Sequence, residues 1–319
     1  MELPPFREVN HEIKLIDPSK VIRYRTPRCP EALKEQLIDK INQYVTAGWW
    51  RQTSTQQAVP MLCLPKKTGK LRTVFDKRLQ NENTVKDVTP FPDQDMIRND
   101  VARSQVRSKI DLTEVYEQIC IVDRDVDKSS FSTIFGTYES LVMQMGDCNA
   151  PSTFQRLMTM IFIKQVGRFI HVYLDDIFVF SMSIEEHEEH LSQVFTLLRA
   201  NHLYLSKTKV DLYSERMDCL GHTIDDQGIH ADTDKLYRLR SWRTPRSYNE
   251  ILRFVGLCNY LALFLPDISA YTSPLTGVNR NNRPFEWTPF LDKCFKSIKH
   301  MATKHLILKT LDWNSPLDI

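Results

Sequence analysis

Two adjacent aspartates, Asp175 and Asp176, interrupt the otherwise apolar run IHVYLDDIFVFS (170–181). Two apolar runs joined by a polar pair predict a β-hairpin with the carboxylates at its turn. Like charges at the tip of buried strands repel each other, and this disfavours their ionised forms. A divalent cation removes that cost, because hard ions such as Mg²⁺ take carboxylate oxygens and keep positions open for phosphate and water. An ordinary Asp-Asp hairpin turn is the alternative.

A third carboxylate strengthens the metal hypothesis. The run SKIDL (108–112) places Asp111 at the end of a predicted strand, and Tyr116 follows five residues later. Three carboxylates suit a two-metal site, in which ions about 3.5–4 Å apart hold the attacking and leaving oxygens of an in-line displacement. A helix N-cap is an equal alternative for Asp111 taken alone.

Apolar spacing predicts the elements that must position these residues. Helical spacing begins after Pro30 and ends at Gly48, and a basic turn around Gly69 separates two apolar runs typical of a hairpin. The predicted helices cover 30–48, 151–166 and 185–201. Strands or hairpins are expected over 61–75, 108–121, where a strand leads into a short helix, 170–181 and 219–224, a strand near a turn.

The pattern changes near Gly228, after which an all-helical, basic region is expected. Ser247-x-x-Glu250 forms a capping box, and Thr288-Pro289 starts a further amphipathic helix. Residues 235–310 carry 13 Lys and Arg against 4 Asp and Glu, although the whole chain has a net charge of only +2. This asymmetry suggests that the protein binds a polyanion through its basic C-terminal region. A solvated basic face is an equal alternative.

Composition narrows the class of protein. A chain of 319 residues allows one large or about two to three small folding units with real cores. No apolar run approaches the roughly 18 residues needed to span a bilayer, so no membrane role is expected. The first residues lack a secretory signal, which favours the cytoplasm or nucleus. Seven scattered cysteines with no Cys-x-x-Cys pair favour neither a disulfide framework nor a zinc site.

A set of ordered motifs resembles the reverse transcriptase of gypsy-class (Metaviridae) LTR retrotransposons over about residues 10–308. The motifs are LPKKTGKLR (64–72), Asp76-x-Arg78 with Asn81, SKIDL (108–112), FSTIFGTYE (131–139), NAPSTFQRLM (149–158), YLDD (173–176), EEHEEHL (185–191), LGH (220–222) and FVGLCNYL (254–261). Only the polymerase part is expected, because no room for an RNase H domain follows Lys309.

The resemblance implies an α+β fold, the right-hand polymerase with fingers, palm and thumb. The implied subdomains are an N-terminal segment with fingers (1–90), palm (91–121), second finger part (122–150), palm with the YLDD hairpin (151–227), helical thumb (228–285) and the start of a connection (286–319).

The resemblance also implies roles for individual residues. Asp111, Asp175 and Asp176 would hold two Mg²⁺ ions, with Mn²⁺ as an alternative metal and the Leu112 carbonyl as an extra ligand. Lys66 or Lys67 together with Arg72 would clamp the triphosphate of the nucleotide. Tyr116 would be the steric gate against a 2′-hydroxyl, Met145 would lie in the nucleotide pocket, and Lys209, with Lys207 competing, would protonate pyrophosphate.

Nucleic-acid contacts are implied for two further regions. Cys219, Leu220, Gly221 and His222 resemble the primer grip, although His222 alone is better explained as a packed histidine. Arg240, Arg243, Arg246 and Arg253, in the basic helical region with Arg238, would contact backbone phosphates without regard to base sequence. An RNA template or RNA–DNA hybrid would be recognised by groove shape and 2′-hydroxyls.

Several residues depart from the family pattern. Lys77 replaces an aromatic residue, and Val115 and Glu117 replace a glycine and a histidine beside Tyr116. Met145, Asp147 and Cys148 replace Phe, Leu and Thr or Lys. Tyr260-Leu-Ala-Leu-Phe264 replaces a more basic Tyr-Tyr-Arg-Arg-Phe, which removes one pair of implied phosphate contacts.

The function predicted from the resemblance is an RNA- and DNA-dependent DNA polymerase that copies retrotransposon RNA by two-metal nucleotidyl transfer. Its partners would be an RNA template, a DNA primer, their hybrid and deoxynucleoside triphosphates, with a homodimer or an RNase H-bearing partner as further options. The expected place is the cytoplasmic retrotransposon particle, with the nucleus as an alternative. Two alternatives stay open: a non-catalytic or domesticated RNA- or hybrid-binding protein, and a structural subunit of a reverse transcriptase dimer.

Overall fold

The computed structural model describes residues 2–66, 68–206, 208–277, 285–303 and 307–309. The chain forms two compact units. The first comprises Met1–Pro92, Lys109–Val179 and Glu185–Leu212, and the second comprises Asp93–Ser108, Phe180–Ile184 and Tyr213–Ile319. None of the helices described is long and apolar enough to cross a membrane.

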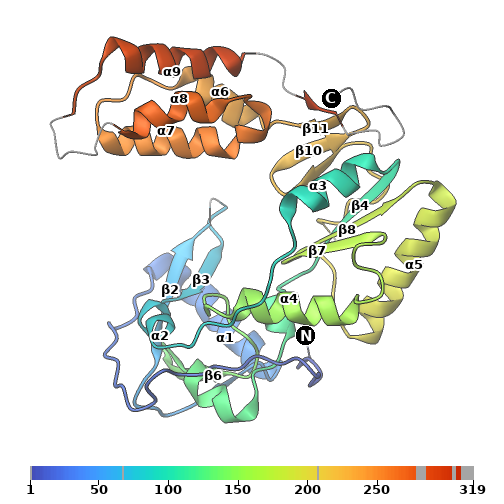
Figure 1. Ribbon diagram of the computed structural model, residues 1–319. Coiled ribbons are helices and arrows are strands. Elements are labelled where there is room, and N and C mark those ends of the chain that lie inside the picture. The colour runs from blue at the N-terminus through green and yellow to red at the C-terminus, as the bar shows by residue number, and fades with distance from the viewer. Residues whose placement is uncertain (1, 67, 207, 278–284, 304–306, 310–319) are drawn as a thin grey trace. The chain divides into compact units, whose positions relative to one another are not determined.

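A five-stranded sheet forms one half of the first unit (Figure 1). Its strand order is β1-β6-β5-β2-β3, antiparallel except for the parallel pair β2 and β5. The strands are β1 (Trp50–Gln52), β2 (Val59–Pro65), β3 (Leu71–Phe75), β5 (Phe131–Thr133) and β6 (Gly136–Ser140). The hairpin predicted over 61–75 is confirmed as β2–β3, and its turn contains Gly69 at a φ of +76°, which favours glycine.

Short helices surround this sheet, and α1 supplies part of its core. Leu37, Ile41 and Tyr44 recur at helical spacing on the buried face of α1. The helix ends just before Gly48, whose φ is +74°, and this confirms the predicted helix. The helical segments in this part of the unit are η1 (Glu31–Leu33), α1 (Lys34–Thr46), α2 (Arg78–Glu82), η2 (Tyr116–Gln118) and η3 (Asp123–Ser129).

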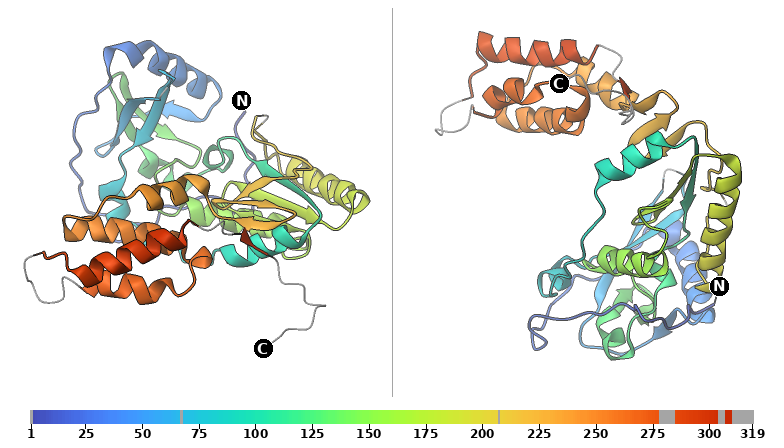
Figure 2. Two further views of the ribbon diagram at one scale, coloured as in Figure 1. Left: turned by 90° about the horizontal axis from the view of Figure 1, so that it is seen from above. Right: turned by 45° about the vertical axis from the view of Figure 1, so that its right-hand side comes forward.

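A three-stranded sheet, order β4-β8-β7, carries the candidate aspartates. Its strands are β4 (Val106–Asp111), β7 (Ile170–Tyr173) and β8 (Asp176–Ser181), and the helices α4 (Ala150–Ile161) and α5 (Ile184–Ala200) pack with it (Figures 1 and 2). Ile110, Phe154, Val172, Val179 and Val194 all contribute to this core. Burial explains why β7 and β8 are mostly apolar in sequence, whereas β4 (VRSKID) is mixed.

One predicted helix is too long. Residues 151–166 were expected to be helical throughout, but α4 ends at Ile161 and turns follow. Val166 forms a bridge to Ile170, and Gly167 adopts a φ of +78°. The chain must reverse here to enter β7, so tertiary pairing replaces the last helical turn that apolar spacing favoured.

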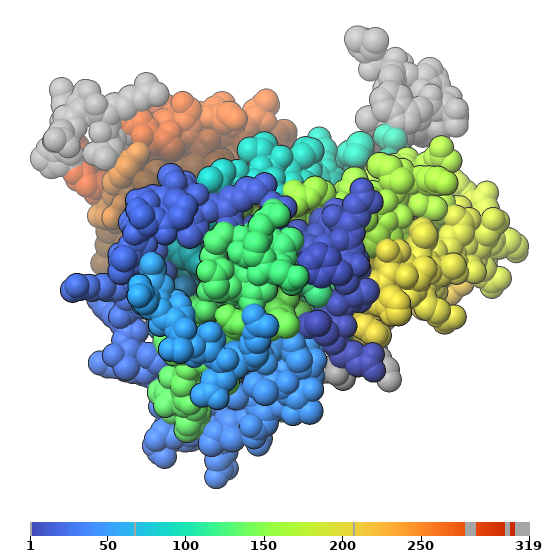
Figure 3. All heavy atoms as spheres, turned by 90° about the horizontal axis from the view of Figure 1, so that it is seen from below, coloured from blue at the N-terminus to red at the C-terminus, as the bar shows by residue number. Residues whose placement is uncertain are grey.

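The N-terminal segment lies across the surface of the first unit (Figure 3, dark blue). The Arg7 guanidinium donates hydrogen bonds to the carbonyls of Gln118 and Asn201. His11 forms a bridge to Ile121, and the Ile13 amide donates to the Asp125 carboxylate. These contacts join distant parts of the chain and have no counterpart in local sequence pattern.

The second unit contains a four-stranded sheet, order β12-β11-β10-β9, against which α3 packs. The region after residue 228 is therefore not all-helical as expected, because its first residues form a strand. The segment 219–224 is likewise not a single strand, since a turn at Leu220–Gly221 divides it into two. The elements are α3 (Gln94–Arg103), β9 (Met217–Cys219), β10 (His222–Asp225), β11 (Gly228–His230) and β12 (Ile307–Leu308).

The rest of the second unit is a helical bundle with an apolar centre (Figure 2). The Phe254 ring lies 5.8 Å from that of Trp242 and 4.7 Å from that of Phe295. The Ser247 hydroxyl accepts from the Glu250 amide as predicted, whereas the Glu250 carboxylate accepts from the Arg246 amide. The helices are α6 (Thr233–Ser241), α7 (Tyr248–Tyr260), η4 (Ala262–Phe264), α8 (Ile268–Thr276) and α9 (Pro289–Met301).

An aromatic cluster in the first unit gives a stability prediction. The Phe131 ring is fully buried and lies 4.8 Å from Trp50 and 4.9 Å from Phe75. Phe131→Ala is expected to lower the free energy of unfolding by about 3–5 kcal/mol, because it leaves a cavity. Urea unfolding followed by tryptophan fluorescence measures it. Val88→Ala, at a residue 92% exposed, is the control and should change little.

Candidate active site

Backbone pairing brings the three candidate aspartates to one place. Asp111 is the last residue of β4, and Asp176 is the first residue of β8, paired with Tyr173. The Leu112 amide donates to the Asp175 carbonyl at 3.4 Å, which ties the strand end to the hairpin turn. The sequence placed both Asp175 and Asp176 at the turn, whereas the structure gives the turn to Leu174 and Asp175.

The turn adopts an unusual backbone conformation. Leu174 has a φ of +53°, a region in which residues other than glycine are strained. Its amide donates to the Gln155 side chain at 3.0 Å, and the same carboxamide donates to the Val172 carbonyl at 3.0 Å. Gln155 lies on α4 and is 1% exposed. A buried glutamine therefore holds the aspartate turn in place.

The three carboxylates interact electrostatically. Burial raises the pKa of Asp176, and the charges of Asp175 and Asp111 raise it further, while Lys109 opposes the shift. The Lys109 Nζ lies 2.9 Å from Asp176 Oδ2, and the Lys209 Nζ lies 3.1 Å from Asp111 Oδ2. Two lysines thus offset part of the repulsion that three neighbouring carboxylates create.

The chemistry of this donor set suits a divalent cation. Within the described ranges, no three His, Cys, Asp or Glu side chains form a metal-binding group as they stand. The three aspartates nevertheless supply hard oxygen donors whose mutual repulsion a divalent cation would relieve. The Leu112 backbone adjoins them, in keeping with the implied carbonyl ligand. These residues therefore fit a hard divalent metal.

Tyr116 lies beside the aspartate turn. Its ring is half-buried and packs against the core that surrounds the three-stranded sheet. Burial raises the pKa of its hydroxyl, and the charge of Asp175 adds to the shift. This proximity is what the implied role as a steric gate requires.

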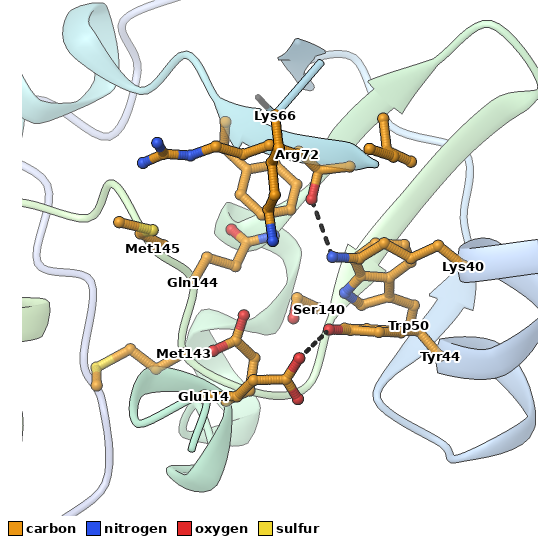
Figure 4. A pocket seen from close by; sticks show the side chains of 14 residues that line it. Lys40, Tyr44, Trp50, Lys66, Arg72, Glu114, Ser140, Met143, Gln144 and Met145 are labelled. Atoms are coloured by element: carbon orange, nitrogen blue, oxygen red, sulfur yellow. Dashed lines mark hydrogen bonds between the residues drawn. The ribbon is translucent and has the colours of Figure 1, made fainter. Parts of the chain in front are cut away.

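A cavity of about 380 Å³ gathers the implied nucleotide-binding residues (Figure 4). Lys66 and Arg72 line it from the β2–β3 hairpin, where Arg72 pairs with Leu64, and Met145 lines it from the loop before α4. Tyr116 and the three aspartates are not among its lining residues. Lys67 and Lys207 lie outside the described residues.

Sequence reasoning did not assign several polar residues to this pocket, among them three charged side chains and one carboxamide. These four are Lys40, Glu114, Glu117 and Gln144. The Lys40 Nζ donates to Thr73 Oγ1 at 3.0 Å and lies 4.7 Å from the centre of the Tyr44 ring, one helical turn along α1. Burial raises the pKa of Glu117 to about 7. One signal in the sequence could have identified Lys40. It lies four residues before Tyr44, so both side chains belong to the buried face of the same helix.

The implied primer grip is a hairpin tip held by a helix of its own unit. Leu220 and Gly221 form the turn, with φ values of +48° and +84°, while the side chains of Cys219 and His222 are buried. The Tyr260 hydroxyl donates to the Gly221 carbonyl at 2.5 Å. Burial lowers the pKa of His222 to about 4. Gly221 is exposed whereas His222 is buried, so the turn rather than the His222 side chain faces solvent.

The four implied phosphate-binding arginines are exposed in the helical bundle. These are Arg240, Arg243, Arg246 and Arg253. Arg240 also donates from its Nε to the Ala302 carbonyl, which links α6 to the end of α9. Arg240 therefore has a structural role that the sequence did not indicate.

Comparison with known proteins identifies the family. The family model described as "Reverse transcriptase (RNA-dependent DNA polymerase)" matches residues 64–224, half of the chain. The chain belongs to the reverse transcriptase family. The predicted resemblance to gypsy-class enzymes is confirmed by the Tf2-3 and Tf2-7 transposon polyproteins of Schizosaccharomyces pombe, each 26% identical over 313 residues. These matches cover 98% of this chain but only 24% of each polyprotein.

Solved structures show the fold. A foamy viral protease-reverse transcriptase in complex with double-stranded DNA matches with a TM-score of 0.80 at 21% identity, covering 98% of this chain and 54% of that one. A foamy viral protease-reverse transcriptase in complex with RNA/DNA hybrid matches with a TM-score of 0.75 at 20% identity, covering 98% and 44%. The predicted α+β right-hand polymerase fold is confirmed. The subdomain limits given above stay predictions.

The hairpin tip yields a prediction with an internal control. At Gly221 a Cβ would collide with the Tyr260 hydroxyl, and the φ of +84° disfavours side chains. Gly221→Ala is expected to lower stability by about 1–2 kcal/mol, and by less in a Tyr260→Phe background. Gly256→Ala, inside α7 with open space around it, should instead raise stability by about 0.5–1 kcal/mol. Thermal unfolding compares them, and equal losses at both glycines would contradict the clash.

Proposed function

We propose that this chain is the polymerase module of an RNA- and DNA-dependent DNA polymerase that copies a retrotransposon RNA. The observation that carries the proposal is the junction of β4 with the β7–β8 hairpin, which unites Asp111, Asp175 and Asp176. A loose assembly of basic residues would not require three mutually repelling carboxylates at one end of a sheet. The family membership supports the same activity.

In this proposal, the residues of the site have different roles in nucleotidyl transfer. Two Mg²⁺ ions, when bound, would lower the pKa of the primer 3′-hydroxyl and neutralise charge on the pyrophosphate. Asp111, Asp175 and Asp176 would hold them, with Mn²⁺ as a substitute metal. The Arg72 guanidinium can bind phosphate oxygens with two parallel N–H groups, and Lys66 adds a point charge.

Two further residues act on the ends of the nucleotide. The Tyr116 ring would lie under the sugar and exclude a 2′-hydroxyl. Lys209 is positioned beside Asp111, where its ammonium can donate a proton to pyrophosphate as charge develops on the leaving oxygen. The exposed arginines of the helical bundle would hold the template–primer through phosphates.

The proposed partners are an RNA template, a DNA primer, their hybrid and deoxynucleoside triphosphates. Support comes from the two foamy viral structures, which hold double-stranded DNA and RNA/DNA hybrid. A homodimer or an RNase H-bearing partner is proposed for the assembly, and the cytoplasmic retrotransposon particle for its location.

Primer extension tests the activity. The protein is given a DNA primer on an RNA template, four deoxynucleotides and Mg²⁺, with extension and template–primer binding measured in parallel. Asp175→Asn should abolish extension and leave binding largely intact, because it removes a metal ligand at a turn held by other contacts. Asp39→Asn, an exposed aspartate on α1, is the control and should behave as the parent. Binding without extension by the parent would instead favour the non-catalytic hybrid-binding alternative.

Sugar discrimination tests the gate. Tyr116→Ala should admit ribonucleotides, because the half-buried ring that would meet the 2′-hydroxyl is lost. Tyr116→Phe keeps the ring and should keep the discrimination of the parent. Competition between ribo- and deoxynucleotides in single-nucleotide extension measures both. Equal discrimination by all three proteins would remove Tyr116 from the gate role.

A further inference from the structure

A lysine is fully buried in the first unit. Lys77 lies just before α2 with an exposed fraction of 2%, and its Nζ is 2.7 Å from Asp147 Oδ1. The other carboxylate oxygen of Asp147 lies 3.5 Å from His11 Nε2, and His11 Nδ1 lies 3.1 Å from Thr153 Oγ1. Three segments that are distant in sequence therefore meet at one buried carboxylate.

Lys77 and Asp147 stabilise each other's charge in this buried position. Burial alone would raise the pKa of Asp147, but the charge of Lys77 and the contact with His11 outweigh it and lower the pKa to about 2. Removing one partner of a buried pair leaves an uncompensated charge, at a typical cost of about 3–5 kcal/mol. Lys77 and Asp147 both depart from the residues that the family pattern carries. The 2.7 Å contact joins these two departures in one ion pair.

The pair fixes a loop that further bonds hold on both sides. The Asn81 side chain donates to the Gly146 carbonyl at 2.8 Å and accepts from the Cys148 amide at 3.0 Å. Gly146 has a φ of +112°, and a Cβ there would lie 3.2 Å from the Phe75 carbonyl oxygen. Residues 146–148 are thus held at three consecutive positions against α2 and the end of β3.

The loop presents two side chains to the nucleotide pocket. Gln144 and Met145 both line the 380 Å³ cavity, and Figure 4 shows Gln144 projecting between Lys66 and Glu114. Gln144 is 2% exposed, and within the described part of the chain neither atom of its carboxamide has a hydrogen-bond partner. A buried polar group without a partner costs about 1–3 kcal/mol, and a polar ligand can recover that cost.

We propose that the buried Lys77–Asp147 pair is a positioning device for the nucleotide pocket, which holds the Gln144 carboxamide where it hydrogen-bonds the incoming nucleotide. The inference rests on the proposed polymerase function. Gln144 is the substrate-contacting residue, while Lys77 and Asp147 act through the loop.

An apolar replacement of the whole pair separates positioning from stability. The Lys77→Met/Asp147→Leu protein removes both charges at similar volume, so it should fold with at least the parent's stability. The Asp147→Leu protein leaves Lys77 buried without its carboxylate partner, so it should unfold at a lower temperature than the parent. In single-turnover extension, the double variant should bind the nucleotide about tenfold more weakly, because its loop has lost the attachment at residue 147 and keeps only those to Asn81. Its maximal rate should change less.

Substitution of Gln144 tests the proposed contact with the nucleotide directly. Gln144→Leu should raise the unfolding temperature, because it removes two unpartnered polar atoms, and should weaken nucleotide binding to a similar degree. Adding Gln144→Leu to the double variant should weaken binding no further, since residues that act as one unit are not additive. Full additivity would mean that the pair does not act through Gln144.

A matched control and a second loop variant complete the design. Lys128→Met removes the lysine from the Lys128–Asp125 pair, whose Asp125 is 4% exposed, elsewhere in the same unit, and it should leave the nucleotide Kd unchanged. Asn81→Ala loosens the loop without touching the pair and should weaken nucleotide binding even if the double variant does not fold. Parent-like nucleotide Kd values in Asn81→Ala and in every folded pair variant would overturn the proposal. A parent protein that neither extends primers nor binds nucleotide would instead overturn the proposed function.

Discussion

Mutual repulsion among three carboxylates is the constraint on which the rest of this site depends. Asp111 is buried at the end of β4, Asp176 is partly buried beside it, and Asp175 is exposed at the turn, so the three carboxylates meet at the solvent edge of the sheet. The fold opposes their repulsion with Lys109 and Lys209, each paired with one aspartate. It also fixes the turn through Gln155, so the carboxylates cannot separate without breaking bonds to a buried side chain. A divalent cation would relieve the repulsion that the two lysines leave.

The cavity that we propose as the nucleotide pocket is lined by charged side chains of both signs. Lys66 and Arg72 project from the hairpin, and Glu114 lies across from them. Glu117 also lines the cavity, and its charge acts on Lys40. A cavity lined only by cations would bind any phosphate, whereas facing carboxylates disfavour an anion that enters in the wrong register. The buried Lys77–Asp147 pair does not line this cavity, but Gln144 and Met145, shortly before Asp147 in the chain, do.

Much of the local structure could be predicted because its cause is local. Periodic apolar residues determined α1 and α5, and the Gly69 turn determined the β2–β3 hairpin. The same reasoning failed where tertiary pairing overrode local preference. The last predicted turn of the helix over 151–166 gives way to the reversal into β7. The strand β11 forms because its partners β10 and β12 offer hydrogen bonds that no sequence window contains.

The sequence by itself determined the candidates for chemistry, because these depend on residue types at short, fixed spacings. They are the three aspartates in their motifs, the basic hairpin with Arg72, and Tyr116. Only the tertiary structure decided which charged side chains form pairs. Lys209 reaches Asp111 across 98 residues, Lys77 reaches Asp147 across 70, and Lys40 enters the pocket from α1. Such pairs leave no local signal, because a buried charge is stabilised by whatever group the folded chain brings within a few ångströms, irrespective of separation along the sequence.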